Sequence, residues 1–259
     1  MSSETSTDLS VTLADGVALL EMCRPPSNHV DEDLLGRLVD AALTLDADPA
    51  CRAIVLTSRG KHFCAGANLG GGAFARDRAA AAEGLYRHAA RLFGVGIPIV
   101  AAVQGSAVGG GLGLACAADF RVAEASTRFV ANFARLGFHQ GFGLTVTLPE
   151  LVGRQAAADM LFTARRVGGE EAHRLGLADR LAAPGTLRES AHELALRIAA
   201  SAPLAVRAIR RSLRGDLAER VRRALDQELG EQRALWATRD SAEGIEASLQ
   251  RREPAFLGE

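Results

Sequence analysis

The sequence is poor in the features that mark several classes of protein. Its 30 basic and 31 acidic residues give a net charge of -1, which implies no overall attraction to nucleic acid or to a membrane surface. No apolar run approaches the roughly 20 residues that a membrane-spanning helix needs. The 259 residues are otherwise of ordinary globular composition, with 48% hydrophobic and 24% charged residues, and suffice to bury a large core.

Cysteine is also scarce. The four cysteines show neither the paired spacing of a zinc site nor the density of a disulfide framework. We therefore expect reduced thiols and no metal site, which favours the cytoplasm. The first ten residues, MSSETSTDLS, lack the basic and apolar regions of a signal peptide, and a cytoplasmic location is expected on this ground too.

Apolar runs predict several strands. The dipeptide Asp15-Gly16 lies between two such runs and predicts a β-hairpin. Residues 53–57 and 97–103 are apolar except for Thr57, which is typical of strands buried on both faces, and 119–123 predicts a third such strand.

Helical patterns separate these strands. Apolar residues recur at helical spacing behind Asp31, a suitable N-cap, and an alanine- and arginine-rich helix is predicted at 76–93. Strand and helix in alternation indicate an α/β fold with parallel strands and crossover helices. Beyond about residue 150 helical periodicity dominates. We expect a basic cluster there to be a solvated helix face: Arg207, Arg210, Arg211 and Arg214.

The stretch VQGSAVGGGLGLA, residues 103–115, places glycines directly after a predicted strand. Neither a dinucleotide fingerprint nor a phosphate loop fits, because the spacing differs from G-x-G-x-x-G and the required lysine is missing. A helix that begins with bare glycine presents free N–H groups and the positive end of its dipole, which suits an oxyanion of an acyl substrate. Close packing of the helix on a strand is the alternative explanation.

A second loop favours the oxyanion interpretation. The segment KHFCAGANL, residues 61–69, follows the preceding buried strand, so the two loops can each direct one N–H group to a shared point. With the closing RREPAFLG at 251–258, these motifs resemble those of the crotonase, or enoyl-CoA hydratase/isomerase, superfamily. The resemblance covers nearly the whole chain and depends on the motifs in combination.

The resemblance implies a fold, a substrate class and two catalytic amides. It implies a crotonase-like ββα-repeat core, residues 1–195, with CoA-binding and oxyanion-hole loops, followed by a helical C-terminal trimerisation part, residues 196–259. The family binds a CoA thioester and holds its carbonyl oxygen between two backbone N–H groups, which correspond to Ala67 and Gly110. Coenzyme A would be part of the substrate, no cofactor would be covalently bound, and the protein would be a homotrimer or a dimer of trimers.

The same resemblance assigns a binding role to further residues. Arg24 and Pro26, together with the loop from Ala65 to Leu69, would surround the adenine and pantetheine of CoA. Asn68 in that loop replaces the usual aspartate of the family, with little chemical consequence expected. The remaining positions expected to contact the substrate are Tyr86, Phe133, Gln140 and, in the C-terminal tail, Phe256.

The sequence departs from the family where hydratases carry two glutamates. These positions correspond to Gly113 and Phe133, and the glutamate that the isomerases of the family carry corresponds to the vicinity of Gly141. General acid–base catalysis typically contributes about 10²–10⁴-fold, so ordinary hydration should be weak or missing. His139 is a candidate for the proton-transfer group, because imidazole exchanges protons near neutral pH. A packed or solvent-facing ring is the alternative for this histidine.

Three functions follow from this pattern. The leading hypothesis is an acyl-CoA enzyme that stabilises a thioester enolate without the hydratase glutamates, as a lyase, isomerase, decarboxylase or hydrolase. The second is an enoyl-CoA hydratase with a substitute base such as His139. The third is a non-catalytic acyl-CoA-binding protein.

Overall fold

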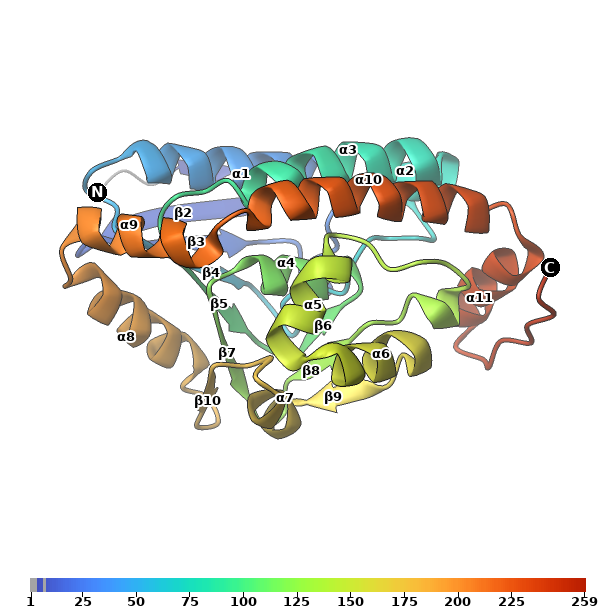
Figure 1. Cartoon of the computed structure of the whole chain (residues 1–259). Helices are drawn as coiled ribbons and strands as arrows, with labels where there is room; N and C mark the ends of the chain where they lie inside the picture. Colours follow the sequence, from blue (N-terminus) through green and yellow to red (C-terminus); the bar gives the residue numbers. More distant parts are fainter. Residues whose placement is uncertain (1–3, 7) are drawn as a thin grey trace.

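The computed structural model describes residues 4–6 and 8–259 (Figure 1). The chain starts with three antiparallel strands: β1 (Glu4–Ser6), β2 (Leu9–Ala14) and β3 (Val17–Met22). Asp15 and Gly16 between β2 and β3 have φ values of 53° and 78°, and a two-residue type I′ turn requires positive φ at both positions. The hairpin predicted from this dipeptide is confirmed.

Parallel pairing extends the sheet from β3. The strands that follow it across the sheet are β4 (Ala53–Ser58), β5 (Ile99–Val103), β7 (Phe120–Glu124) and β10 (Arg180–Ala182). Every residue of β4 and β5 is buried, as predicted for strands covered on both faces. The strand predicted at 97–103 begins only at Ile99, after Pro98, which has no amide hydrogen for a neighbouring strand.

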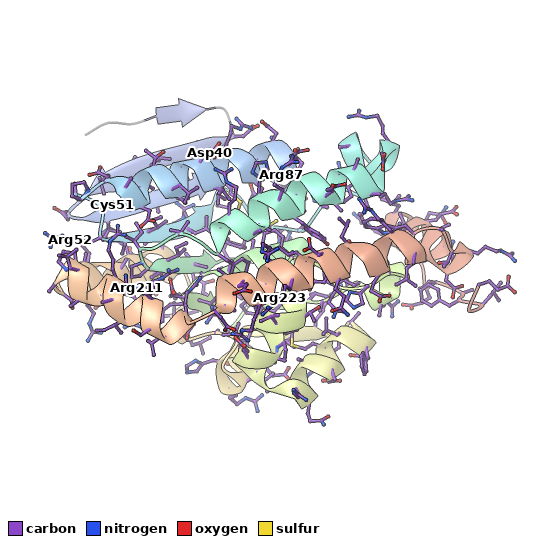
Figure 2. All side chains as sticks on the ribbon, turned by 45° about the horizontal axis from the view of Figure 1, so that its top comes forward. Asp40, Cys51, Arg52, Arg87, Arg211 and Arg223 are labelled. Carbon is purple, nitrogen blue, oxygen red and sulfur yellow. The ribbon has the colours of Figure 1, made fainter. Side chains whose placement is uncertain are left out.

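A layer of helices covers one face of the sheet. It consists of α1 (Glu32–Ala47), α2 (Gly72–Arg76), α3 (Arg78–Leu92) and α10 (Leu217–Leu235), and Figures 1 and 2 show α1, α3 and α10 side by side. Asp31 caps α1 by accepting a hydrogen bond from the Leu34 amide at 2.9 Å, as predicted. The helix predicted at 76–93 begins at Arg78, because Asp77 is its N-cap and accepts from the Ala80 amide at 3.0 Å.

The other face of the sheet is covered by α8 (Leu187–Ala199). Side chains of β4 alternate between the two layers: Ile54 and Leu56 pack with the α1 and α3 side, whereas Val55 packs with α8. The expected boundary between residues 195 and 196 falls inside α8, where Ala195 is fully buried against the sheet.

A second, smaller sheet has three strands, and the remaining helices lie around the two sheets. Its strands, in spatial order, are β6 (Ser106–Val108), β8 (Arg128–Val130) and β9 (Arg166–Gly168). The helices are α4 (Gly110–Ala117), a 3₁₀ turn (Ala134–Leu136), α5 (Leu144–Val152), α6 (Arg154–Thr163), α7 (Gly169–Leu175), α9 (Pro203–Arg214) and α11 (Arg239–Gln250). Helices dominate beyond residue 150 as predicted, although β9 and β10 were missed because three residues are too few for a periodic pattern.

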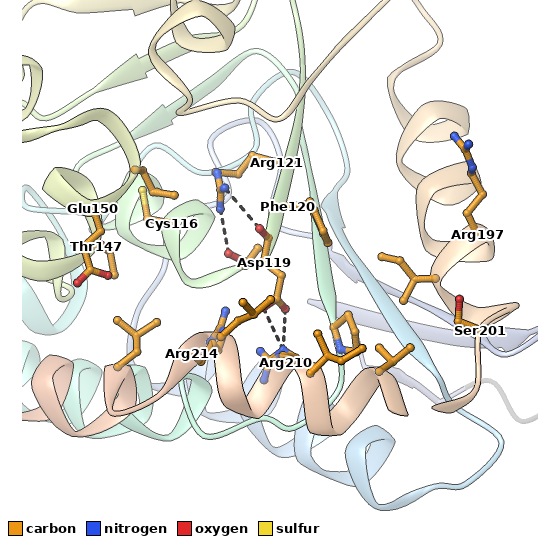
Figure 3. Close-up of a pocket in the computed structure, with 18 of the residues that line it drawn as sticks. Cys116, Asp119, Phe120, Arg121, Thr147, Glu150, Arg197, Ser201, Arg210 and Arg214 are labelled. Atoms are coloured by element: carbon orange, nitrogen blue, oxygen red, sulfur yellow. Dashed lines mark hydrogen bonds and ion pairs between the residues drawn. The ribbon is translucent and has the colours of Figure 1, made fainter. Parts of the chain in front are cut away.

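The basic cluster of α9 is not a solvated face. Arg210 and Arg214 both direct their Nε atoms at Asp119, at 2.9 Å each, and the side chains of the two arginines are only 9% and 15% exposed. Figure 3 shows Arg210 and its contact with Asp119. Arg207 likewise pairs with Asp46 at 2.8 Å. The prediction was therefore wrong for three of the four arginines, because their carboxylate partners are remote in sequence; Arg211 alone of the four is exposed (Figure 2).

The cysteines form no disulfide in the structure. Cys51, Cys64 and Cys116 are buried free thiols, and Cys23 is a half-buried one. Burial raises the pKa of Cys64 to about 12, so this thiol in the loop after β4 is not a nucleophile. Within residues 4–6 and 8–259, no helix combines the length and the apolar character that crossing a membrane requires.

Candidate active site

Two loops that follow adjacent parallel strands run side by side. The loop after β4 pairs with β6 almost as a strand would: the Cys64 amide donates to the Ser106 carbonyl at 3.2 Å, and the Val108 amide donates to the Cys64 carbonyl at 3.0 Å. β4 and β5 end at the same edge of the sheet, so this pairing places Ala67 beside the start of α4. The sequence prediction that the two loops meet is confirmed.

The glycines permit this close approach. A Cβ on Gly66 would lie 2.8 Å from the Val108 carbonyl oxygen, and one on Gly111 would lie 2.8 Å from the Cβ of Cys64. Gly109, the N-cap of α4, has a φ of 54°, which a residue with a side chain rarely adopts. Gly110 differs, because a Cβ there would have its nearest neighbours at 3.8 and 3.9 Å. Close packing explains Gly66 and Gly111, and backbone conformation explains Gly109, whereas a Cβ on Gly110 would make only ordinary van der Waals contacts.

Ala67 and Gly110 line a small cavity of about 60 Å³. Ala65, Gly66 and Leu69 contribute to the same wall. Gly110 is the first residue of α4, and an amide in the first turn has no acceptor within its own helix. In the described part of the chain, neither the Ala67 amide nor the Gly110 amide donates to another group. Two unpaired amides therefore border one cavity.

The rest of the cavity is apolar. Phe133 and Phe138 meet edge to face with ring centroids 6.0 Å apart, and Phe138 meets Trp236 in the same way at 5.7 Å. Further apolar side chains line the walls: Phe74, Leu85, Leu136 and Phe142. The polar side chains that line it are Tyr86, Asn132 and Gln232. Of the described residues, no aspartate, glutamate, histidine, lysine or arginine lines this cavity.

Aromatic rings fill the space at Gly113 and Phe133, the two positions that the sequence resemblance assigns to the hydratase glutamates. Phe133 itself is 7% exposed and lines the cavity. A side chain on Gly113 would meet Phe142, whose Cγ would lie 2.8 Å from the new Cβ. Phe142 has a φ of 62°, an unusual conformation for a bulky residue, and its ring is fully enclosed. The space for a carboxylate at residue 113 is thus taken by the ring of Phe142.

Tyr86 donates a hydrogen bond from its hydroxyl to Gln232 Oε1 at 2.9 Å. Gln232 in turn donates from Nε2 to the carbonyl of His139 at 2.8 Å. A Cβ on Gly141 would overlap the Tyr86 hydroxyl and lie 2.7 Å from its Cζ. Burial raises the pKa of the Tyr86 hydroxyl well above its ordinary value, so this group stays protonated at neutral pH.

Glu228 on α10 holds the loop that carries Phe142. Its carboxylate accepts from the amides of Gly143 at 2.8 Å and Thr145 at 2.9 Å, at the N-terminus of α5. Burial raises the pKa of Glu228, and these two amides oppose that shift. Sequence reasoning missed Glu228, Gln232 and Trp236, because they lie more than 80 residues along the chain from the loop they contact, on an ordinary amphipathic helix and at its end.

His139 and Gln140 lie in the loop but do not line the cavity. His139 Nδ1 is 2.8 Å from the carbonyl oxygen of Gln140, and the ring is half-buried. Gln140 donates from Nε2 to Thr145 Oγ1 at 3.1 Å. The structure therefore places His139 behind the wall of the cavity, next to the groups that hold the loop.

A second cavity of about 300 Å³ adjoins the first. Arg24, Pro26 and Asn68 line it, and Phe74 lines both cavities. Arg24 pairs there with three carboxylates: Asp8 at 2.9 Å, Asp31 at 2.6 Å and Asp33 at 3.1 Å. Apart from Gln140 and Phe256, the expected substrate-binding residues thus fall into an inner group at the amides and an outer group around Arg24. Phe256 lies apart from both cavities, in the C-terminal tail, and is 42% exposed.

Known proteins share both the sequence and the fold. The family model for enoyl-CoA hydratase/isomerase matches residues 12–259. A putative enoyl-CoA hydratase/isomerase of Bacillus subtilis is 35% identical, with 93% of this chain and 95% of that protein covered. A crotonyl-CoA hydratase of Syntrophomonas wolfei is 33% identical over 93% of this chain and 94% of its own.

A solved structure, an enoyl-CoA hydratase/isomerase from Pseudoalteromonas atlantica, superposes with a TM-score of 0.86 and 28% identity, and covers 96% of this chain and 100% of its own. The expected crotonase fold is thereby confirmed. The family-model match over residues 12–259 includes both loops, the α4 helix that follows the glycines and the C-terminal helices. The chain belongs to the enoyl-CoA hydratase/isomerase family, the crotonase superfamily.

Proposed function

We propose that the protein is a cytoplasmic enzyme that binds an acyl-CoA thioester with its carbonyl oxygen between the amides of Ala67 and Gly110. The observation that carries this proposal is the pair of unpaired amides on one small, apolar cavity. Negative charge on the thioester oxygen grows as an enolate forms, so donors fixed in a dry site stabilise the transition state more than the substrate. Relatives named as a crotonyl-CoA hydratase and a carnitinyl-CoA dehydratase support a CoA thioester as the substrate.

The reaction we propose is not hydration by paired glutamates. Phe133 and Phe142 fill the positions from which the two carboxylates would hold and activate water. An enolate-forming lyase, isomerase, decarboxylase or hydrolase needs the amide pair but not those carboxylates. A hydratase with His139 as a substitute base is the second candidate, because His139 lies in the loop that borders the cavity and its carbonyl accepts a hydrogen bond from Gln232.

The outer cavity suits the CoA portion of the substrate. Arg24, Pro26 and Asn68 line it, and it shares Phe74 with the inner cavity, so a pantetheine arm could pass from one to the other. Coenzyme A enters this proposal as part of the substrate, and no covalently bound cofactor is included. The role proposed for Phe256 requires the C-terminal tail to approach the CoA phosphates.

We expect crotonyl-CoA to bind but to be hydrated with a kcat far below about 10 s⁻¹, a typical value for enzymes. The single tryptophan, Trp236, lines the cavity, so its fluorescence reports binding without interference. A panel of CoA thioesters, followed by mass spectrometry for gain of water, loss of CO₂ or free CoA, identifies the reaction. Fast hydration of crotonyl-CoA would contradict the proposal, and binding without any turnover would favour a non-catalytic acyl-CoA-binding protein.

We further propose that the chain self-associates through α9 as a trimer or a dimer of trimers. A groove of about 610 Å³ lies between α5, α8 and α9, and Figure 3 shows the side chains that line it. Ile209 and Leu213 line this groove and are 59% and 83% exposed. Exposed apolar side chains on one helix face gain free energy when a second copy covers them.

Leu213→Asp should therefore lower the oligomeric state, which sedimentation velocity measures directly. Leu204 on the same helix is the matched control, because it is 81% exposed but does not line the groove, so Leu204→Asp should leave the assembly intact. A wild-type monomer, or equal effects of the two variants, would overturn this assignment of the interface.

A further inference from the structure

The inner cavity contains a proton donor but no group that acts as a base at neutral pH. Of the described side chains that line it, only Tyr86 carries a titratable proton, and Asn132 and Gln232 contribute neutral amides. Glu228 lies behind the wall, and the amides of Gly143 and Thr145 occupy its oxygens. The cavity can therefore supply a proton but cannot readily remove one.

The Tyr86 hydroxyl is well placed to supply it. It is buried and stands where a side chain on Gly141 would project. The hydrogen bond that the hydroxyl donates to Gln232 fixes the direction in which its proton points. The acceptor of this hydrogen bond is Gln232 Oε1, and the neutral side chain of Gln232 also lines the cavity.

The absence of a base among these side chains distinguishes between the reactions that can form an enolate. Removing a proton from the α-carbon requires a base. Releasing an acyl group from the α-carbon requires a water molecule that a base activates. Releasing CO₂ from an α-carboxylate requires neither. The thioester carbonyl accepts the electron pair, and the only further need is one proton. Apolar walls such as Phe133, Phe138 and Phe142 also disfavour a carboxylate relative to neutral CO₂.

We propose that the enzyme decarboxylates a CoA thioester with a carboxylate on its α-carbon, and that Tyr86 donates the proton. The bond between the α-carbon and the carboxylate carbon breaks, its electron pair forms the enolate, and CO₂ leaves. The enolate oxygen faces the amides of Ala67 and Gly110, and the hydroxyl proton of Tyr86 passes to the α-carbon. The phenolate then regains a proton from water. This inference rests on the proposed acyl-CoA function.

Asn132 is the side chain that can orient the carboxylate. It lies beside Gly109, where a Cβ would be 3.0 Å from its Oδ1, and its carboxamide makes no hydrogen bond within the described chain. Gln232, in contrast, is engaged at both ends by Tyr86 and the His139 carbonyl. A free amide donor near the oxyanion loop can hold the carboxylate while the apolar walls exclude water.

The experiment uses malonyl-CoA and methylmalonyl-CoA as probes in D₂O, with wild type, Tyr86→Phe and His139→Ala. Wild type should release CO₂ and place one deuterium on a single face of the product α-carbon. Tyr86→Phe should lower kcat by about 10²-fold and lose that stereospecificity, with little change in the affinity reported by Trp236 fluorescence. If Tyr86→Phe keeps rate and stereospecificity, or if only His139→Ala loses them, the assignment to Tyr86 is wrong.

A more conservative change to the Tyr86 side chain tests the same role if Tyr86→Phe fails to fold. Tyr86 is the only tyrosine in the chain, so uniform incorporation of fluorotyrosines changes this hydroxyl alone and retains its hydrogen bonds. The rate of proton delivery should then vary with the acidity of the fluorotyrosine, whereas a structural hydroxyl would give one rate for all. Binding of both probes without CO₂ release overturns the decarboxylation alone. Failure of every CoA thioester to bind overturns the proposed function itself.

Discussion

Gly110→Pro should lower turnover by about 10²–10³-fold, the usual effect of losing one oxyanion donor. The substitution deletes the amide hydrogen that we propose faces the thioester oxygen. The helix should tolerate it, because Gly110 is the first residue of α4, where proline is favoured. Space is also available, since a Cβ at this position has its nearest neighbours, Phe142 and Val30, at 3.8 and 3.9 Å.

Gly110→Ala is the matched control for that experiment. It adds the same Cβ but keeps the amide, so turnover should stay within a few-fold of wild type. Both variants should be measured on the thioester that the panel identifies, with circular dichroism and the thermal midpoint to confirm folding. A folded Gly110→Pro enzyme with wild-type kcat would show that the Gly110 amide does not touch the reacting oxygen.

Much of the fold could be predicted because the deciding signals are local. Asp15-Gly16 specifies its turn through two positive φ angles, Asp31 caps the helix that follows it, and β4 begins with four apolar residues because both of its faces are covered. The elements that escaped prediction, such as α2, β9 and β10, are three to five residues long. At that length neither a helical nor an alternating pattern completes a period.

The candidate site likewise has a part that local motifs predict and a part that they do not. The two loops could be placed from their motifs, since consecutive parallel strands end at one edge of the sheet. The wall opposite the amides could not, because it depends on contacts between remote segments. Nothing near Phe142 indicates that its ring fills the space at Gly113, and nothing near Gln232 or Glu228 indicates that α10 holds the loop from His139 to Thr145.

The arginines of α9 show the same limit for electrostatics. Charge density alone suggested solvation, whereas Asp119 lies more than 90 residues away along the chain from Arg210 and close to it in space. In the sequence, a solvated arginine and a buried arginine paired with a remote carboxylate give the same pattern. Contacts of this kind decide which side chains are free to bind a substrate.

The ring of Phe142 also predicts which substitutions would restore hydration. Gly113→Glu with Phe133→Glu alone should fail, because the new Cβ at residue 113 would lie 2.8 Å from Phe142 Cγ and closer still to its Cβ. Overpacking of this kind costs about 1–3 kcal/mol, so the double variant should also melt at a lower temperature. Phe142→Gly removes the obstruction and suits the φ of 62°.

The triple variant Gly113→Glu, Phe133→Glu, Phe142→Gly should therefore hydrate crotonyl-CoA at least about 10²-fold faster than wild type, the lower end of what general acid–base catalysis contributes. Its control carries glutamine at 113 and 133 with the same glycine at 142, which reproduces the shape without the carboxylates. Hydration is followed by the loss of the enoyl absorbance. Equal rates for the two triple variants would mean that space, not the carboxylates, limits hydration. A double variant as active as the triple would mean that Phe142 is no barrier.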